Sequence, residues 1–350
     1  MLQVVPYDEE GRQGVPHSIT LTVDNPATSD RWFPVGLPGL AVSDLALAPS
    51  DPQVLYAAAE TGEIYKSLDA GMIWGISDSG IPDDIRLVSL AISPTDSNVV
   101  YAGNPGGGIY LSTDGGGLWS TIAPNIPAED LAIAATDPEI LFAAGWQGAY
   151  RSLDGGASWA AVLPGVALKS VAVDPSNPQV VYVGESSFAA PMHKTVDGGS
   201  SWAPLTVGDL NGQIQTILID PHNTNVLYVG KLWGPGGVYK STDGGVSWTR
   251  TGLESGVNTE SLAMAPNDSQ MLYAGNLWGG VFKTVDGGAT WARLGGGLPS
   301  DPAVMALEVD PLNPEVVYAG LWNGGVWEYL VNPPAPVYQI FLPLILRDAQ

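Results

Sequence analysis

A short motif repeated six times constrains the fold of this chain more than any other feature of its 350 residues. The motif, Ser/Thr-x-Asp-x-Gly-x-x-Trp, is called the box below, and successive box Trp residues lie 40 to 46 residues apart. The Asp and Trp residues of the six boxes are Asp69 and Trp74, Asp114 and Trp119, Asp154 and Trp159, Asp197 and Trp202, Asp243 and Trp248, and Asp286 and Trp291. A fixed period of this length is typical of repeat architectures, in which each repeat is one supersecondary unit.

A second signature indicates seven repeats rather than six. An Asp or Asn lies shortly before an apolar run in every unit, at Asp51, Asp96, Asp137, Asn177, Asn223, Asp268 and Asn313. In the second unit, residues 87–92, 99–103, 108–112 and the segment from Trp119 read as four short strands, because β-branched and aromatic runs alternate with turn residues. Four strands in each of seven units predict an all-β fold, a seven-bladed β-propeller of four-stranded antiparallel blades.

The two ends of the chain are expected to close this ring. The seventh unit, at residues 304–330, lacks a box and therefore a fourth strand, whereas the segment from Trp32 is followed by Gly-Leu-Pro, as Trp291 is. Because an open ring exposes sheet edges, the N-terminal segment is predicted to complete the last blade. The expected organisation is an extension at 1–29, the propeller at 30–331, and a Pro-rich spacer with an apolar tail at 332–350. Residues 18–24 are expected to form a further edge strand or to belong to an upstream domain.

Composition excludes several classes of protein. The 13 Lys and Arg against 36 Asp and Glu give a net charge of −23, which repels phosphate backbones and excludes nucleic acid as a partner. The absence of Cys removes disulfides and thiolate metal sites. No run reaches the ~18 apolar residues of a membrane-spanning helix, and the first residues lack the pattern of a signal peptide. His17, His193 and His222 are too few and too scattered for a metal site or a Ser-His-Asp triad. We therefore expect no cofactor, no metal and no transmembrane span, in a monomeric ring.

The box has a sufficient local explanation as a structural staple. Its Asp can accept backbone N–H bonds across a turn, its Ser or Thr hydroxyl adds another bond, and its Gly takes a positive φ. Its Trp then packs over the hairpin, where burial of ~200 Å² of aromatic surface contributes up to roughly 5 kcal/mol. The alternative is that the box Asp residues bind calcium.

The box resembles the Asp-box, or BNR repeat, of sialidases, sortilin-type receptors, photosystem II assembly factors and xyloglucan-cleaving endoglucanases built from two propellers. The resemblance covers residues from about 30 to 330 and implies the fold, but it constrains function weakly, because one scaffold carries both catalysts and binders. The sialidase resemblance implies an arginine triad and an Arg-Ile-Pro segment, and this sequence has no Arg-Ile-Pro. The photosystem resemblance implies a basic surface, and the sortilin resemblance implies a larger ring with a disulfide-rich tail. The charge of −23 and the absence of Cys depart from both.

The xyloglucanase resemblance is closer at one segment. Residues 56–66 align without gaps with a segment of the first propeller of those enzymes and place Glu60 at their catalytic Asp, which makes Glu60 a weak catalytic candidate. Those enzymes draw a second carboxylate from a second propeller, and glycosidases need the two groups about 5 to 9.5 Å apart. A single ring is expected to supply half of this site.

The face that carries the loops between strands two and three, and between blades, is called the upper face; the boxes and the Pro-Asp turns lie on the lower face. Trp146, Trp233, Trp278 and Trp322 stand beside Gly in upper-face loops. These indoles either form platforms for sugar rings or wedge between blades as part of the core. The acidic residues expected on or near this rim, as solvated charges or ligand contacts, are Glu60, Asp83, Asp84, Glu129, Asp130, Glu185, Asp209, Glu254 and Asp301.

The tail at 333–347 resembles the Pro-rich spacer and Leu-Pro-Leu ending of many secreted proteins of filamentous green nonsulfur bacteria, which implies cell-surface sorting; the alternative is a spacer and strand that pack against the ring. The sequence therefore predicts an extracellular, non-catalytic binding or scaffold propeller for a polysaccharide or another protein. A glycoside hydrolase is the alternative. The ligand-binding candidates are Trp146, Trp233, Trp278, Trp322, Glu60, Asp84, Arg86 and Glu185.

Overall fold

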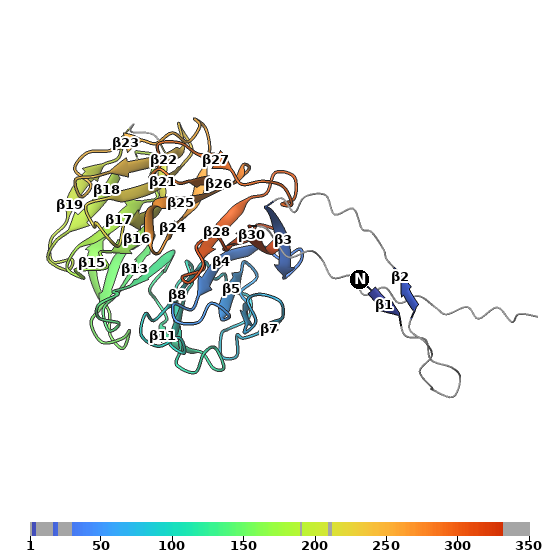
Figure 1. Ribbon diagram of the computed structural model, residues 1–350. Helices are drawn as coiled ribbons and strands as arrows, with labels where there is room; N and C mark the ends of the chain where they lie inside the picture. The colour runs from blue at the N-terminus through green and yellow to red at the C-terminus, as the bar shows by residue number, and fades with distance from the viewer. Residues whose placement is uncertain (1, 5–16, 20–29, 190, 209–211, 332–350) are drawn as a thin grey trace, which may run out of the picture. The chain divides into compact units, whose positions relative to one another are not determined.

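Seven four-stranded antiparallel sheets are arranged around a common axis (Figure 1). The computed structural model describes residues 2–4, 17–19, 30–189, 191–208 and 212–331, and these contain no helix. Innermost strands of neighbouring blades contact each other all the way around the ring, and the last of them returns to the first. The all-β prediction of a seven-bladed propeller is thus confirmed.

Each blade contributes four consecutive strands, except where the chain closes the ring. The strands of blades 1 to 3 are β4 (Val42–Leu47), β5 (Leu55–Ala59), β6 (Ile64–Ser67), β7 (Trp74–Ile76), β8 (Ser89–Ile92), β9 (Val100–Gly103), β10 (Ile109–Ser112), β11 (Ser120–Ala123), β12 (Asp130–Ile133), β13 (Leu141–Gly145), β14 (Gly148–Ser152) and β15 (Ala160–Pro164). Those of blades 4 to 6 are β16 (Leu168–Val173), β17 (Val181–Glu185), β18 (Pro191–Thr195), β19 (Ala203–Thr206), β20 (Gln213–Ile219), β21 (Leu227–Leu232), β22 (Gly237–Ser241), β23 (Thr249–Arg250), β24 (Thr259–Ala265), β25 (Asp268–Asn276), β26 (Gly280–Thr284) and β27 (Ala292–Arg293).

Blade 7 is built from both ends of the ring. It contains β28 (Val304–Val309), β29 (Val317–Leu321) and β30 (Gly325–Leu330), and its outer strand is β3 (Arg31–Gly36). Trp32 on β3 pairs with Tyr329 on β30 in an antiparallel ladder, and their rings lie 5.3 Å apart. The predicted closure by the N-terminal segment is therefore confirmed.

The core lies between blades. Successive side chains along each strand point to opposite faces of the sheet and therefore toward the two neighbouring blades. The buried residues form clusters shared by adjacent sheets. One such cluster joins Tyr56 and Ile64 of blade 1 to Leu90 and Tyr110 of blade 2. The second strand of every blade carries a buried aromatic residue at the same position, namely Tyr56, Tyr101, Phe142, Tyr182, Tyr228, Tyr273 and Tyr318. All seven rings contribute apolar area, and the hydroxyls of Tyr56, Tyr101, Tyr182, Tyr228 and Tyr273 also bond to the next blade.

Those hydroxyls latch the blades to one another. The Tyr56 hydroxyl donates to the carbonyl of Gly115 in the box of blade 2 at 3.0 Å, and Tyr228 makes the equivalent bond to Gly287 at 3.0 Å. Lys66 donates to the same Gly115 carbonyl at 2.7 Å. Each latch satisfies a box carbonyl that would otherwise need water.

A separate two-stranded sheet pairs β1 (Leu2–Val4) with β2 (His17–Ile19). The strand expected at 18–24 thus pairs with β1 rather than with a blade, over the part that the structure describes. Residues 20–29 and the tail at 332–350, on which the surface-sorting and packing alternatives depend, lie outside the described residues.

Candidate ligand-binding site

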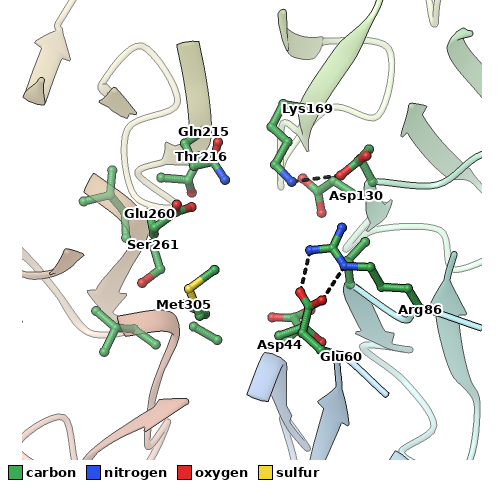
Figure 2. Close-up of a pocket in the computed structure, with 16 residues that line it drawn as sticks. Asp44, Glu60, Arg86, Asp130, Lys169, Gln215, Thr216, Glu260, Ser261 and Met305 are labelled. Carbon is green, nitrogen blue, oxygen red and sulfur yellow. Dashed lines mark hydrogen bonds and ion pairs between the residues drawn. The ribbon is translucent and has the colours of Figure 1, made fainter. Parts of the chain in front are cut away.

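The upper end of the central channel opens into a polar cavity of about 190 Å³ (Figure 2). Its charged lining comes from the starts of innermost strands and from upper-face loops of several blades. Its ionisable side chains are Asp44, Glu60, Arg86, Glu129, Asp130, Lys169 and Glu260. These side chains converge because equivalent positions in successive repeats surround the same axis.

Glu60 and Arg86 form the ion pair at the mouth of this cavity. Glu60 follows β5 and Arg86 precedes β8, and the guanidinium donates through Nε to Oε2 of the carboxylate at 2.6 Å and through Nη2 to Oε1. The hydrogen bond to Glu60 raises the pKa of Arg86 above its ordinary value. Bidentate pairs of this kind fix the orientation of both groups. The Glu60 carboxylate is therefore held toward a cation and not toward a second carboxylate.

A second ion pair crosses from blade 3 to blade 4. The Lys169 ammonium donates to Oε2 of Glu129 at 2.8 Å, and both side chains keep about a quarter or less of their surface exposed, at 25% and 20%. Glu260 faces Lys169 from the opposite wall of the cavity in Figure 2. Burial raises the pKa of Glu260, and the charge of Lys169 opposes that rise.

Two deeper carboxyl groups serve the ring itself. Asp44 accepts the backbone N–H of Leu45 at 2.9 Å and that of Leu90 in the next blade at 2.7 Å. Asp130 accepts the N–H of Val171 in blade 4 at 2.9 Å. Desolvation raises the pKa of Asp44 to about 7 and that of Asp130 to about 6, although these N–H groups lower both. Both carboxyl groups are occupied in joining blades.

One lining hydroxyl has no partner. Ser261 Oγ is buried and makes no hydrogen bond within the described part of the chain. A buried polar atom without a partner costs about 1 to 3 kcal/mol. The cavity therefore offers a free hydroxyl to a small polar ligand or to water.

The four candidate Trp residues lie exposed at the upper rim. Trp146, Trp233, Trp278 and Trp322 keep 56%, 41%, 58% and 42% of their surface accessible, and the Trp146 indole N–H donates to the Pro105 carbonyl of the neighbouring blade at 3.0 Å. The Trp233 and Trp278 rings, in neighbouring blades, lie 6.1 Å apart and are tilted by 56°. Trp233 has a φ of +65°, a conformation that is costly for a bulky residue.

A fifth aromatic residue extends this row. Phe188 occupies the corresponding loop of blade 4 and is 65% exposed. Trp146, Phe188, Trp233, Trp278 and Trp322 thus place one exposed ring on each of five successive blades, and this set is called the aromatic arc below. Sequence inspection missed Phe188 because it has no adjacent Gly. The signal was its position in the loop between the second and third strands of its repeat.

The remaining candidates lie apart from the cavity. Glu185 Oε1 lies 2.7 Å from His193 Nε2 within blade 4 and accepts its N–H. Asp84 has a φ of +61° and lines a separate depression of about 410 Å³ with Asp83 and Glu63. Asp209 lies outside the described residues. Lys169, Asp44 and Glu260, which line the cavity, were not among the sequence candidates, although Lys169 and Glu260 hold equivalent positions of the repeat and Asp44 holds the next one.

The boxes form a repeated hydrogen-bond network. In blade 4, Thr195 donates to Oδ1 of Asp197 at 2.7 Å, and Asp197 accepts the Ser201 N–H at 2.9 Å and its hydroxyl at 2.6 Å. These bonds lower the pKa of Asp197 to about 2, the largest contribution coming from Ser201. Among the described residues, no group of three or more His, Cys, Asp or Glu side chains is placed to hold a metal ion. The Asp197 oxygens are thus occupied by donors from the protein itself, as expected for a box with a structural role.

The fold is shared with solved structures of low sequence identity. A GH74 xyloglucanase from Xanthomonas campestris matches with a TM-score of 0.71 and 20% identity over 85% of this chain and 53% of its own. YCF48 from Cyanidioschyzon merolae matches with a TM-score of 0.67 and 17% identity over 85% of this chain and 98% of its own. A YCF48 structure bound to D1 peptide matches with a TM-score of 0.67 and 16% identity over 88% and 98%. This chain spans about half the length of the xyloglucanase.

No protein-family model and no curated protein matches this chain. No helix in the described part of the chain has the length and apolar character needed to cross a membrane.

Proposed function

We propose that this chain is a non-catalytic, extracellular binding propeller of the Asp-box type that holds a polysaccharide against the aromatic arc. The observation that carries the proposal is the row of five exposed rings on successive blades, each in the loop between the second and third strands of its blade. Soluble proteins seldom expose several large aromatic rings along one rim without a ligand for them. Indole offers a flat apolar face for the C–H face of a sugar ring and an N–H donor at its edge.

The polar cavity beside the arc supports the same proposal. Arg86 and Lys169 are the cations at its mouth, and each is paired with a carboxylate. Sugar hydroxyls bind well to such pairs, because they donate to the carboxylate and accept from the cation. The unpartnered Ser261 hydroxyl adds a further contact for a polar ligand.

The glycoside hydrolase alternative has less support. Its candidate carboxylate, Glu60, is engaged by Arg86 through both oxygens, and Asp44 and Asp130 accept backbone N–H groups of neighbouring blades. A glycosidase needs one free acid and one free base or nucleophile. We expect Glu60→Gln to leave any release of reducing ends from xyloglucan at the level of the wild type.

A glycan array tests the binding proposal. We expect the wild type to bind at least one class of polysaccharide, and Trp233→Ala with Trp278→Ala to weaken that binding at least tenfold, because the tilted pair is lost. Leu312→Ala is the control, since Leu312 is also an exposed apolar residue, at 75%, but lies in a lower-face turn. Equal binding by the wild type and the double variant, or binding by neither, contradicts the proposal.

A further inference from the structure

The repeats show that the box does not require an aliphatic residue directly before its Trp. In blades 3 to 6 this position is Ser or Thr, and its hydroxyl donates to the box Asp, as Ser201 does at 2.6 Å and Ser247 at 2.6 Å. In blades 1 and 2 the position holds Ile73 and Leu118, which are 72% and 57% exposed. Both residues forgo a hydrogen bond and expose an apolar side chain to solvent. The hydrophobic effect therefore does not explain them in the isolated ring.

Blade 1 concentrates such residues on its lower outer edge. Ile73 is joined there by Leu68, Met72 and Ile76, which are 67%, 80% and 69% exposed. The residues of later blades that correspond to Ile76 are Thr121, Ala161, Pro204, Arg250 and Arg293. All four apolar side chains are more than 60% exposed, and Leu68, Ile73 and Ile76 border one cavity, which is typical of an interaction surface.

A groove runs beside this patch. Leu68, Ile73 and Ile76 line one side of a cavity of about 810 Å³, and the box segment at residues 114–117 of blade 2 lines the other. We call this space the blade 1–2 groove. The apolar residues thus border a concave space rather than a flat surface, which allows an inserted side chain to be surrounded.

The same groove between blades 5 and 6 provides an internal comparison. It measures about 280 Å³ and is lined by Thr249, Arg250, Thr251 and Asp286 instead of aliphatic residues. Both grooves share the Lys side chain that donates to a box Gly, Lys66 to Gly115 and Lys240 to Gly287. The groove itself is therefore a consequence of the fold, whereas its width and apolar lining belong to blades 1 and 2.

Charge identifies the partner that fits. Asp69, Asp78 and Asp114 line the blade 1–2 groove, and hydrogen bonds lower the pKa of Asp69 and of Asp114, so both are ionised at neutral pH. Lys66 is the one cation in the lining, and its ammonium is engaged by the Gly115 carbonyl at 2.7 Å. An occupant with aliphatic side chains and flanking positive charges complements this surface, whereas an anionic membrane is repelled.

We propose that the blade 1–2 groove is a docking site for an extended segment of a partner protein that carries an aliphatic side chain flanked by Lys or Arg. The site is on the opposite face from the aromatic arc, so the chain can hold a ligand above and a protein below. This inference does not depend on the polysaccharide proposal, because the two sites share no residue.

A peptide array against the full chain tests the inference. The probes are ten-residue peptides with a central Leu, Ile, Val or Phe and zero, two or four flanking lysines, together with copies in which Glu replaces each Lys. We expect binding that rises with the number of lysines and falls at least tenfold in Ile73→Ser with Ile76→Thr, which restores residue types found in other blades. Val246→Ser, which removes an exposed aliphatic residue from the box of blade 5, is the matched control and keeps full binding.

Two further measurements separate docking from a structural role. The melting temperature of Ile73→Ser is expected to equal or exceed that of the wild type, because the new hydroxyl can donate to Asp69 as in the other boxes. The second measurement starts from the variant that carries Ile73→Ser and Ile76→Thr. Adding Ser247→Ile and Arg250→Ile to this variant is expected to create peptide binding at the groove between blades 5 and 6.

Several results overturn the inference. Peptide binding that is unchanged in Ile73→Ser with Ile76→Thr, that is indifferent to Lys or Glu, or that is absent from every probe contradicts it. Sedimentation velocity that shows a dimer lost in this variant assigns the groove to a second copy instead. Tighter binding of a synthetic peptide of residues 337–347 than of any basic probe assigns it to the chain's own sequence. Flotation with phosphatidylcholine vesicles that depends on Ile73 assigns it to lipid.

Discussion

Individual residues of the ring can be judged against their equivalents in the other blades. Glu308 on β28 is opposite the buried aromatic residue Tyr318 in the ladder of blade 7. The six equivalent residues are Ala46, Ala91, Ala132, Ala172, Leu218 and Ala263. Burial raises the pKa of Glu308 to about 8, and the nearby Asp44 carboxyl adds to the rise. The fold therefore holds a protonated carboxyl at a position where every other blade has an apolar residue.

This carboxyl predicts a loss of stability with rising pH. The unfolded chain ionises Glu308 near its ordinary pKa of 4.5, whereas the folded chain keeps the proton up to about pH 8. The free energy of unfolding should therefore fall between these two pH values and level off above them. Asp44, whose pKa is raised to about 7, adds to the fall in the lower part of this window.

We expect Glu308→Gln to flatten this dependence, because the amide does not titrate. The measurement is the urea midpoint at pH 5 and pH 8, followed by Trp fluorescence, for the wild type, Glu308→Gln and the exposed control Glu254→Gln. A fall of the same size in all three proteins would show that Glu308 does not carry the effect.

At the level of strand pairs, the seam between blades 7 and 1 lacks a contact that joins several other blades. In blades 1, 4 and 5 a Lys opposite the buried Tyr donates to a carbonyl of the next box, as Lys194 does to Gly244 at 3.0 Å, and the ammonium lies 5.0 Å from the centre of the Tyr182 ring. Glu328 takes this position in blade 7 and accepts a hydrogen bond from the Tyr318 hydroxyl at 3.3 Å. Burial raises the pKa of Glu328. The seam thus lacks the cationic latch that blades 1, 4 and 5 have.

Restoring that latch should strengthen the ring. We expect Glu328→Lys to stabilise the protein by about 1 kcal/mol, since the new ammonium can donate to the Ala70 carbonyl and lie over the Tyr318 ring. Thermal unfolding is the measurement, and Glu254→Lys is the control because it makes the same change in net charge at an exposed site. A melting temperature of Glu328→Lys at or below that of the control would contradict this reading of the seam.

The elements were easier to predict from sequence than the site. Strand positions, the number of blades and closure by the segment at Trp32 follow from periodicity and alternation, because both record which residues must be buried together. The cavity was found only in part. Lys169 and Glu260 each precede an apolar run and look like loop charges in sequence, and only the ring brings them to one axis. The exposure of Trp233 depends on whether other parts of the ring cover it. The alternation of apolar and polar residues within one repeat does not carry this information.

The whole molecule depends on one joint, because β3 is the strand that converts an open row of blades into a closed ring. Trp32 on this strand is 2% exposed and belongs to the cluster between blades 6 and 7, with Tyr273 and Tyr329. Its backbone N–H donates to Gly296 of blade 6 at 3.1 Å. Loss of this side chain therefore weakens both the attachment of β3 and the packing between two blades.

We expect Trp32→Ala to cost about 3 to 5 kcal/mol, as for other buried aromatic residues, and to lower the urea midpoint of the entire ring in one transition. Trp322→Ala is the control, because Trp322 belongs to the same blade but is 42% exposed, and it should change stability by less than about 1 kcal/mol. Unfolding is followed by circular dichroism and by hydrogen exchange of the β28 to β30 amides. If Trp32→Ala releases only β3 while the amides of β28, β29 and β30 stay protected, the ring does not rely on its closing strand. A single transition with protection lost in all blades together instead shows that closure couples every blade, since each sheet then loses the neighbour that buries its face.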